Sequence, residues 1–296
     1  MDMTLPDQLV HSTALIQCVS PDGQPSTGTG FFYQFLRDDD AHISVPALVT
    51  NKHVVEGVNS WSFTVTKSVS GDQPILGERL TIDFYSNAGW IPHPDPNIDL
   101  TIFLLGPTLK KIEKERGIGL YYVNLTNSNL VTDELNAELT AIEPVLMVGY
   151  PIGLWDSTNN LPVARRGITA SPYSIDHDGR SEFLIDAACF PGSSGSPVFL
   201  YNDGPYFKDG SLIVGTRFAF LGVLYAGPVY NASGEISVES IPTTATPVSR
   251  TAIPINIGYC IKSNRLLDFE PILERLRSSD TSDVISDGVL EDNHNS

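Results

Sequence analysis

Basic residues are scarce in this sequence, and their scarcity excludes several classes of partner. The 296 residues include 18 lysines and arginines against 35 aspartates and glutamates, a formal net charge of −17. A nucleic-acid-binding surface needs clustered positive charge, and so does docking on anionic lipid. We therefore expect no nucleic-acid or membrane partner, whereas basic or unfolded polypeptides are compatible with the acidity. The sequence indicates no oligomeric state.

Cysteine is also rare, and long hydrophobic runs are missing. The three cysteines, Cys18, Cys189 and Cys260, are odd in number and have no paired spacing, so they predict neither a disulfide framework nor a zinc site. No segment is as long and apolar as a transmembrane helix, and the first residues lack the basic and apolar regions of a secretory signal. We expect a cytoplasmic protein without a metal or cofactor.

Glycine and proline, in contrast, are abundant. The sequence has 24 glycines and 21 prolines, which separate many short β-branched or aromatic runs, a pattern typical of all-β proteins. The length is ample for a substantial core, in two average domains or one large β domain. Charged residues 107–117 have helix-compatible spacing. Residues 263–276 carry apolar stripes typical of a helix, and Pro271 predicts a kink or two short helices there.

A glycine-punctuated turn at residues 190–197, Phe-Pro-Gly-Ser-Ser-Gly-Ser-Pro, organises the functional argument. Gly192 and Gly195 allow backbone conformations that a Cβ would penalise, so neighbouring amides can be turned toward one point. A serine in such a turn can be a nucleophile if those amides converge on the oxyanion that it creates. Taken alone, the turn fits an ordinary Ser/Gly loop between two strands equally well.

A histidine and an aspartate earlier in the chain favour the catalytic interpretation. His53 lies at the end of a β-rich apolar run, and Asp99 stands just before the strand-like residues 100–105. The chain order His, Asp, Ser is that of the chymotrypsin-type triad. His93 and Asp95 are competing candidates, but they lie in a proline-rich stretch, and we expect them to be loop residues.

Six segments carry motifs that extend beyond the three candidate residues. They are residues 28–32 (Gly-Thr-Gly-Phe-Phe), 49–55 (Val-Thr-Asn-Lys-His-Val-Val), 99–102 (Asp-Leu-Thr-Ile), 148–154 (Val-Gly-Tyr-Pro-Ile-Gly-Leu), 166–170 (Arg-Gly-Ile-Thr-Ala) and 186–197, which contains Asp-Ala-Ala and then Pro-Gly-Ser-Ser-Gly-Ser-Pro. With these segments the chain resembles trypsin-like serine peptidases, and the bacterial HtrA/DegP type is its nearest likeness. The match covers about residues 12–268, and the segments occur in the family's order.

The resemblance implies an all-β fold of two packed six-stranded antiparallel β-barrels with a C-terminal helix. We expect the N-terminal barrel in residues 1–112, the second barrel in residues 113–262 and the helix in residues 263–278. Residues 279–296 are polar and acidic and are expected to form a disordered tail. Residues 202–217 and 235–250 are predicted insertions, the second a mobile loop. No PDZ domain is expected, which is a departure from the HtrA pattern.

The family likeness also implies a role for each site residue. His53 would accept the proton of the Ser194 hydroxyl and later deliver it to the leaving amine. Asp99 would hold the imidazole in the productive tautomer. The amides of Gly192 and Ser194 would form the oxyanion hole. Two positions depart from the family pattern, since Ser196 replaces a second glycine and Ser193 stands where relatives carry Asp or Asn.

Substrate preference follows from the resemblance alone. The floor of the pocket for the side chain before the cleaved bond would be Ala188, six residues before the nucleophile. The walls would be Tyr225, Ala226, Gly227 and Gly258. None of these residues is charged, so we expect polypeptide cleavage after small or medium apolar residues.

Three alternatives remain beside the peptidase. A catalytically silent member of the family could serve as a peptide-binding or scaffolding module, although such proteins often lose the triad that is present here. An esterase could use the same serine, but the α/β-hydrolase order needs a histidine after it, and only His294 follows Ser194. Cys189 could be a thiol nucleophile, but Ser194 holds the Gly-x-nucleophile-Gly position.

Overall fold

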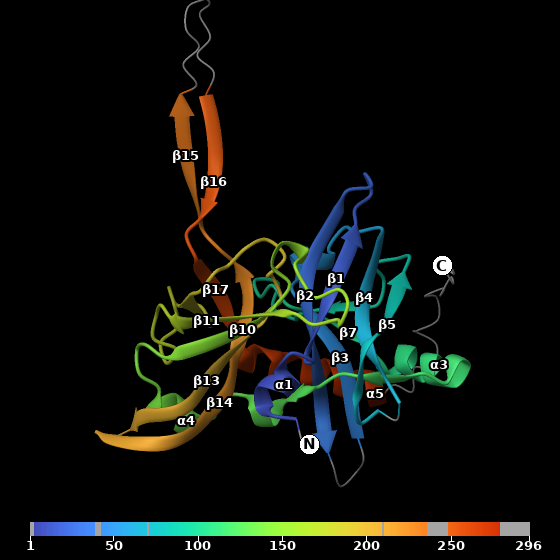
Figure 1. The fold of residues 1–296 in the computed structure, drawn as a ribbon, viewed down its shortest axis with the longest axis horizontal. Helices are drawn as coiled ribbons and strands as arrows, with labels where there is room; N and C mark the ends of the chain where they lie inside the picture. The colour runs from blue at the N-terminus through green and yellow to red at the C-terminus, as the bar shows by residue number, and fades with distance from the viewer. Residues whose placement is uncertain (1–2, 39–42, 70, 209, 236–247, 279–296) are drawn as a thin grey trace, which may run out of the picture.

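The computed structural model describes residues 3–38, 43–69, 71–208, 210–235 and 248–278. Two large, mainly antiparallel sheets dominate this part of the chain, one from each half of the sequence (Figure 1). The predicted all-β fold with a C-terminal helix is therefore confirmed. The expected acidic tail, residues 279–296, lies outside the described residues.

The N-terminal sheet contains nine strands rather than the six that we expected. Its main path runs β5-β4-β1-β2-β3-β7-β6, while β8 pairs with β4 and β9 pairs with β2. Strands β8 and β9 come from residues after 112, so the connector between the halves adds to this sheet. The strands are β1 (Thr13–Val19), β2 (Pro25–Asp38), β3 (Ile43–Thr50), β4 (Ser60–Ser68), β5 (Pro74–Phe84), β6 (Trp90–Pro92), β7 (Thr101–Leu104), β8 (Gly119–Tyr121) and β9 (Leu125–Thr126).

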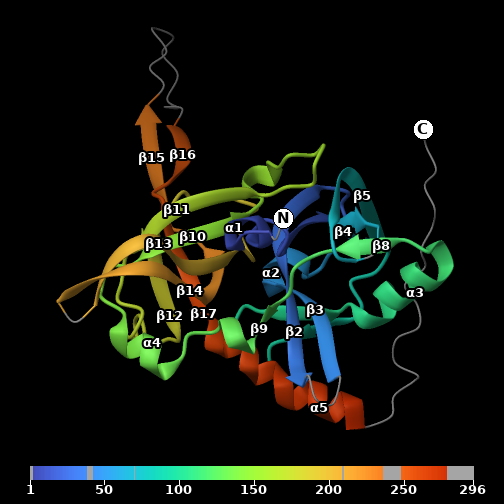
Figure 2. The ribbon, with the colours of Figure 1, turned by 60° about the horizontal axis from the view of Figure 1, so that its bottom comes forward.

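The C-terminal sheet closes into a six-stranded barrel in the order β10-β11-β12-β17-β14-β13. Its strands are β10 (Pro144–Gly149), β11 (Val163–Thr169), β12 (Glu182–Asp186), β13 (Pro197–Lys208), β14 (Ser211–Ala226) and β17 (Ile257–Lys262). Strands β13 and β14 continue past the barrel as one long hairpin in the region of the predicted insertion (Figure 2).

Strand β10 explains how the two sheets pack together. Its residues 145–148 are apolar without interruption, as in a strand that is buried on both faces. Val145 and Met147 face the barrel interior, whereas Leu146 and Val148 join a cluster with Phe31 of β2. Phe220 of β14 meets Phe31 edge to face, with ring centroids 5.3 Å apart. A continuous core therefore lies between the halves.

Short helices complete the chain. They are α1 (Leu5–Leu9), α2 (Lys52–Val55), α3 (Gly106–Arg116), α4 (Asp133–Glu138) and α5 (Glu270–Ser278), with 3₁₀ turns η1 (Asn127–Asn129), η2 (Pro151–Gly153) and η3 (Ser263–Phe269). No helix in the described ranges is long and apolar enough to cross a membrane. Helix α3 confirms the helical character expected for residues 107–117.

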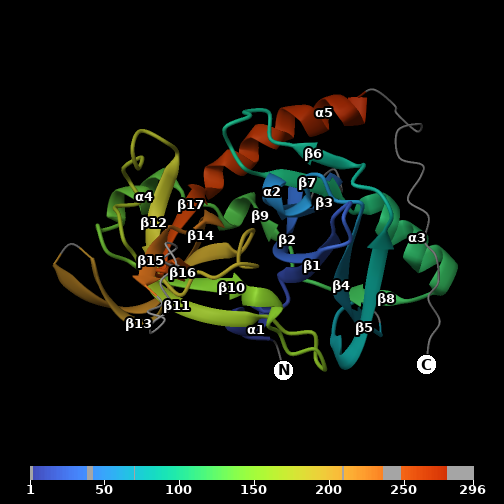
Figure 3. The same cartoon turned by 90° about the horizontal axis from the view of Figure 1, so that it is seen from above.

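The C-terminal segment η3–α5 returns from the barrel to the N-terminal sheet (Figure 3). It consists of two short pieces that meet next to Pro271, as that proline predicts. Leu266, Phe269 and Leu273 are buried in the cluster between the halves. Phe269 packs on Phe35 of β2 with ring centroids 6.0 Å apart. The segment therefore joins the two halves.

A separate two-stranded hairpin, β15 (Val229–Glu235) and β16 (Val248–Pro254), projects from the barrel (Figure 1). Its strands pair in register from Val229↔Pro254 to Glu235↔Val248. The predicted mobile loop, residues 235–250, therefore begins and ends in paired strands, which corrects the prediction at both ends. Residues 236–247 lie outside the described part.

Candidate active site

His53 and Asp99 come together because β3 and β7 are neighbouring antiparallel strands. Thr50 at the end of β3 is opposite Thr101 at the start of β7, so the residues just beyond them are also close. Nδ1 of His53 lies 2.5 Å from Oδ2 of Asp99. The backbone amide of His53 donates to Oδ1 of the same carboxylate at 3.2 Å. This arrangement leaves Nε2 as the ring nitrogen that is available for proton transfer.

The main-chain carbonyl of Asp99 is also held by a hydrogen bond. The side-chain amide of Asn51 donates to the Asp99 carbonyl at 2.7 Å. Asn51 is fully buried and directly precedes α2, the helix that carries His53. One short segment therefore fixes both partners of the pair.

Ser194 lies in the loop between β12 and β13, and hydrogen bonds tie this loop to the N-terminal sheet. The amide of Thr29 in β2 donates to the Ser194 carbonyl at 2.8 Å. The Thr29 carbonyl in turn accepts a hydrogen bond from the hydroxyl of Thr50 at 2.7 Å. Thr50 is only three residues before His53. Thr29 thus brings the serine loop of the second half to the histidine of the first.

The Ser194 hydroxyl itself donates to the carbonyl of Tyr225 at 3.5 Å. Among the hydrogen bonds of the described residues, none joins this hydroxyl to the His53 ring. Without substrate, catalytic hydrogen bonds are often long or poorly aligned and tighten only in the reactive complex.

The amides of Gly192 and Ser194 are the two donors predicted for an oxyanion hole, and both belong to one tightly held turn. Gly192 has a φ of +84°, and a Cβ there would lie 2.7 Å from the Tyr150 carbonyl oxygen. The hydroxyl of Thr29 donates to the Gly192 carbonyl at 3.0 Å. Within the described part of the chain, the amides of Gly192 and Ser194 donate to no acceptor, whereas the Ser193 amide donates to the Phe190 carbonyl.

The segment after β10 is hydrogen-bonded to this loop. The amide of Ile152 donates to the Pro191 carbonyl at 2.5 Å. Ile152 itself has a φ of +48°, which is a strained value for a β-branched residue. The shape of the loop is therefore maintained at a cost in backbone strain.

Cys189 is not placed as a nucleophile. Its side chain is 7% exposed, and burial raises the pKa of the thiol to about 11. A thiol needs its thiolate form to attack. A Cβ at Gly258 would lie 2.7 Å from the Cys189 sulfur, so Cys189 and Gly258 pack against each other in the barrel wall.

His93 and Asp95 connect the N-terminal sheet to the C-terminal segment. The buried His93 ring lies 3.0 Å from the Arg265 carbonyl through Nε2, and Nδ1 accepts the Asp95 amide at 3.0 Å. The Asp95 carboxylate accepts the amide of Asn97 and pairs with Arg265. Among the hydrogen bonds and ion pairs of the described residues, none joins either one to Ser194, and both are loop residues as expected.

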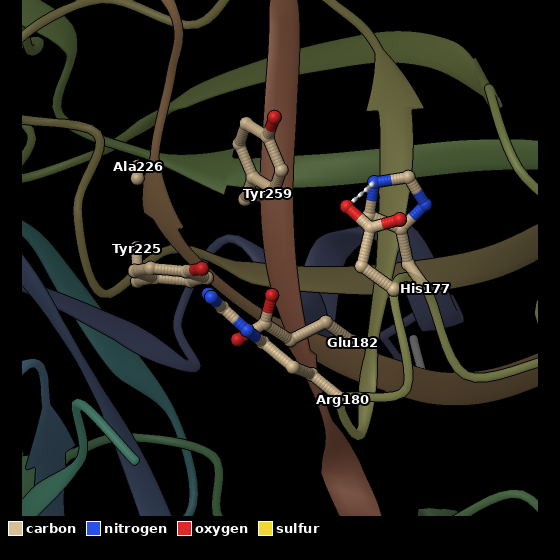
Figure 4. A pocket seen from close by; sticks show the side chains of 7 residues that line it. His177, Arg180, Glu182, Tyr225, Ala226 and Tyr259 are labelled. Carbon is tan, nitrogen blue, oxygen red and sulfur yellow. Dashed lines mark ion pairs between the residues drawn. The ribbon is translucent and has the colours of Figure 1, made fainter. Parts of the chain in front are cut away.

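Two of the five predicted pocket residues, Tyr225 and Ala226, line a cavity of about 280 Å³. Figure 4 shows Arg180 and Glu182 reaching toward the hydroxyl end of Tyr225. Burial raises the pKa of the Tyr225 phenol, and the Glu182 carboxylate adds to the effect. The remaining lining residues are His177, Asp178 and Tyr259.

Ala188, Gly227 and Gly258 do not line this cavity. A Cβ at Gly227 would lie 3.2 Å from the Ile257 carbonyl oxygen, so the strands approach closely there. The sequence argument missed the charged residues of the cavity because residues 177–182 lie outside every segment that resembles a peptidase motif.

We expect Gly195→Ala to destabilise the fold. Gly195 has a φ of +87°, and its Cβ would overlap the Thr29 carbonyl oxygen. Backbone strain and overpacking together should lower the free energy of unfolding by about 3 kcal/mol. Urea unfolding measures this loss. Gly23→Ala is the matched control, since its φ is +80° with no atom within 4 Å, and equal losses in both variants would contradict the close contact.

The model of the trypsin-like peptidase domain matches residues 28–205 of this chain. A search of curated proteins finds no match.

Similar solved structures include three proteases. The Rv3671c protease from M. tuberculosis in its active form is 16% identical, with a TM-score of 0.41 over 88% of this chain and 79% of the other. The thermostable serine protease AL20 from an extremophilic microorganism is 12% identical, with a TM-score of 0.46 over 89% and 97%. The protease Anisep from Arthrobacter nicotinovorans is 11% identical, with a TM-score of 0.45 over 88% and 95%.

Proposed function

This chain belongs to the family of trypsin-like peptidase domains, and on that premise we propose that it is a serine endopeptidase with Ser194, His53 and Asp99 as its catalytic triad. The observation that carries the proposal is the 2.5 Å contact between Asp99 Oδ2 and His53 Nδ1. It engages the one ring nitrogen that must keep its proton if Nε2 is to act as the base.

The proposed reaction begins with attack of the Ser194 oxygen on the substrate carbonyl. Nε2 of His53 takes the hydroxyl proton, and the amides of Gly192 and Ser194 bind the oxyanion. His53 then gives that proton to the leaving amine, which departs and leaves an acyl-enzyme on Ser194. Water, deprotonated by His53, hydrolyses the ester and releases the acid.

For substrate preference, we propose cleavage after small or medium apolar residues. Ala188 supplies no acid to pair with a lysine or arginine, and burying an unpaired cation costs several kcal/mol. A side chain of the size of valine or leucine gains about 1.5–3 kcal/mol by burial. The competing site for the side chain that precedes the cleaved bond is the cavity beside Tyr225. That cavity is lined by an arginine and two carboxylates.

Digestion of a peptide library, followed by mass spectrometry, measures the preference. We expect cuts mainly after valine, alanine and leucine, and a shift toward lysine and arginine in Ala188→Asp. Cuts by the native protein mainly after lysine or arginine would contradict the Ala188 assignment and point to Glu182 or Asp178 instead.

Fluorophosphonate labelling tests the proposed function itself. The reagent phosphonylates an activated serine, so the native protein should be labelled and Ser194→Ala should not. The second candidate, a catalytically silent peptide-binding module, is favoured by the hydrogen bond of the Ser194 hydroxyl to Tyr225 instead of His53. A folded native protein that binds peptides but neither reacts with the reagent nor cleaves would establish that alternative.

A further inference from the structure

Arg165 reaches from strand β11 to both ends of the loop that precedes Ser194. Its Nη1 donates to the Ala188 carbonyl, and its Nη2 donates to the Ser193 hydroxyl oxygen at 3.0 Å. The Ser193 side chain is fully buried, and its oxygen also accepts the Phe190 amide at 3.4 Å. One guanidinium therefore spans residues 188–193.

This guanidinium has no acidic partner among the described residues. Within the described ranges no ion pair involves Arg165, and its Nε is buried without an acceptor there. Burial lowers the pKa of Arg165, yet a guanidinium stays charged in proteins. The fold thus tolerates a costly, partly buried cation that donates to two neutral oxygens of the loop, Ala188 O and Ser193 Oγ.

The same loop carries the amides of Gly192 and Ser194, for which the described part of the chain offers no acceptor. Gly192 lies between the two points that Arg165 holds, and Ser194 follows the second of them. The planar fork of arginine can hold two oxygens in a fixed relation, which lysine cannot do. If the loop shifted between its two anchors, the direction of both amides would change.

We propose that Arg165 is a positioning residue that braces residues 188–193 and thereby aims the amides of Gly192 and Ser194 at the oxyanion. The proposal rests on the proposed peptidase function. Arg165 acts through the loop and needs no contact with the substrate. Its effect therefore belongs to the transition state, in which the oxyanion exists, and not to substrate binding.

Arg165→Met tests this role, with Arg166→Met as the matched control. Arg166 is the next residue on β11 and lies over the Tyr201 ring, 5.8 Å from its centroid, so its loss removes equal charge without touching the loop. We expect Arg165→Met to lower kcat about 100-fold with KM within threefold, since a small misplacement of donors has effects of this order. Arg166→Met should stay within twofold of the native kcat.

Two further variants make the test independent of a folding defect. Arg165→Lys keeps the charge but not the fork, and Ser193→Ala removes one acceptor, so each should lower kcat about 10-fold. Circular dichroism establishes that the variants fold. A kcat for folded Arg165→Met within threefold of the native value, or an equal loss in Arg166→Met, would overturn the proposal.

Hydrogen exchange read by mass spectrometry gives a second measure that needs no activity. Arg165→Met should speed exchange at least about tenfold in peptides covering residues 188–196, with the rest of the barrel unchanged. Faster exchange everywhere, or unchanged exchange in this segment, would overturn the bracing role. A native protein that neither turns over nor reacts with a fluorophosphonate would contradict the proposed function instead, and the exchange experiment would still decide the role of Arg165.

Discussion

Ser194→Ala is expected to lower kcat by about 10⁶-fold, because it removes the proposed nucleophile and leaves only binding and the oxyanion hole. His53→Ala should cost about as much. The double variant should be hardly worse than either one, since a nucleophile without its base, or a base without its nucleophile, forms no acyl-enzyme. The measurement is the steady-state hydrolysis of a peptide substrate that the native protein is known to cleave.

Cys189→Ser is the control for this prediction. The thiol is buried and has a raised pKa, so its replacement should leave most of the activity in place. A Ser194→Ala variant that still turns over, together with an inactive Cys189→Ser, would mean that the sulfur and not the hydroxyl is the nucleophile.

Asp99→Asn is expected to fold normally and to lose about 10⁴-fold in kcat, the size of effect measured for the corresponding change in a trypsin-type triad. The asparagine can still lie against Nδ1 of His53, but its NH₂ group then donates a hydrogen bond to Nδ1. The proton of the imidazole then moves to Nε2, which can no longer accept the serine proton. The comparison of kcat between the variant and the native protein, with thermal unfolding as the measure of the fold, tests this expectation.

Asp95→Asn is the matched control, four residues earlier in the same loop. The Asp95 carboxylate accepts the Asn97 amide and pairs with Arg265, at 2.9 and 3.4 Å, and has no contact with His53. We expect its kcat within threefold of the native value. If Asp99→Asn lost less than tenfold, Asp99 would not be the partner that sets the tautomer of His53.

Much of the fold could be predicted from local sequence. Short β-branched runs between glycines and prolines indicated antiparallel strands, and Pro271 indicated the break between η3 and α5. The number of strands in the N-terminal sheet could not be predicted, because β8 and β9 have only three and two residues. Strands this short have no periodicity of their own and form only where a neighbouring strand offers free amides and carbonyls.

The sequence predicted only those residues of the candidate site that lie in recognisable local motifs. His53, Asp99 and Ser194 lie in segments whose residues resemble a family motif, and the structure brings Asp99 to His53 and ties the Ser194 loop to Thr29. Glu182 and Arg180 carry no such motif. Their place beside Tyr225 depends on the pairing of β12 with β17 and of β17 with β14, which no short window of sequence contains.

The sequence by itself determined the local features: where strands break, which turns need glycine, and the order in which histidine, aspartate and serine occur. Only the tertiary structure decided which of two adjacent arginines faces the active loop. Successive residues of a strand point to opposite faces, so Arg165 and Arg166 had to differ, but the alternation does not say which one turns inward. The pairing of Arg165 with Met147 on β10 decides it, because Met147 belongs to the same buried cluster as Cys189 of the loop that Arg165 contacts.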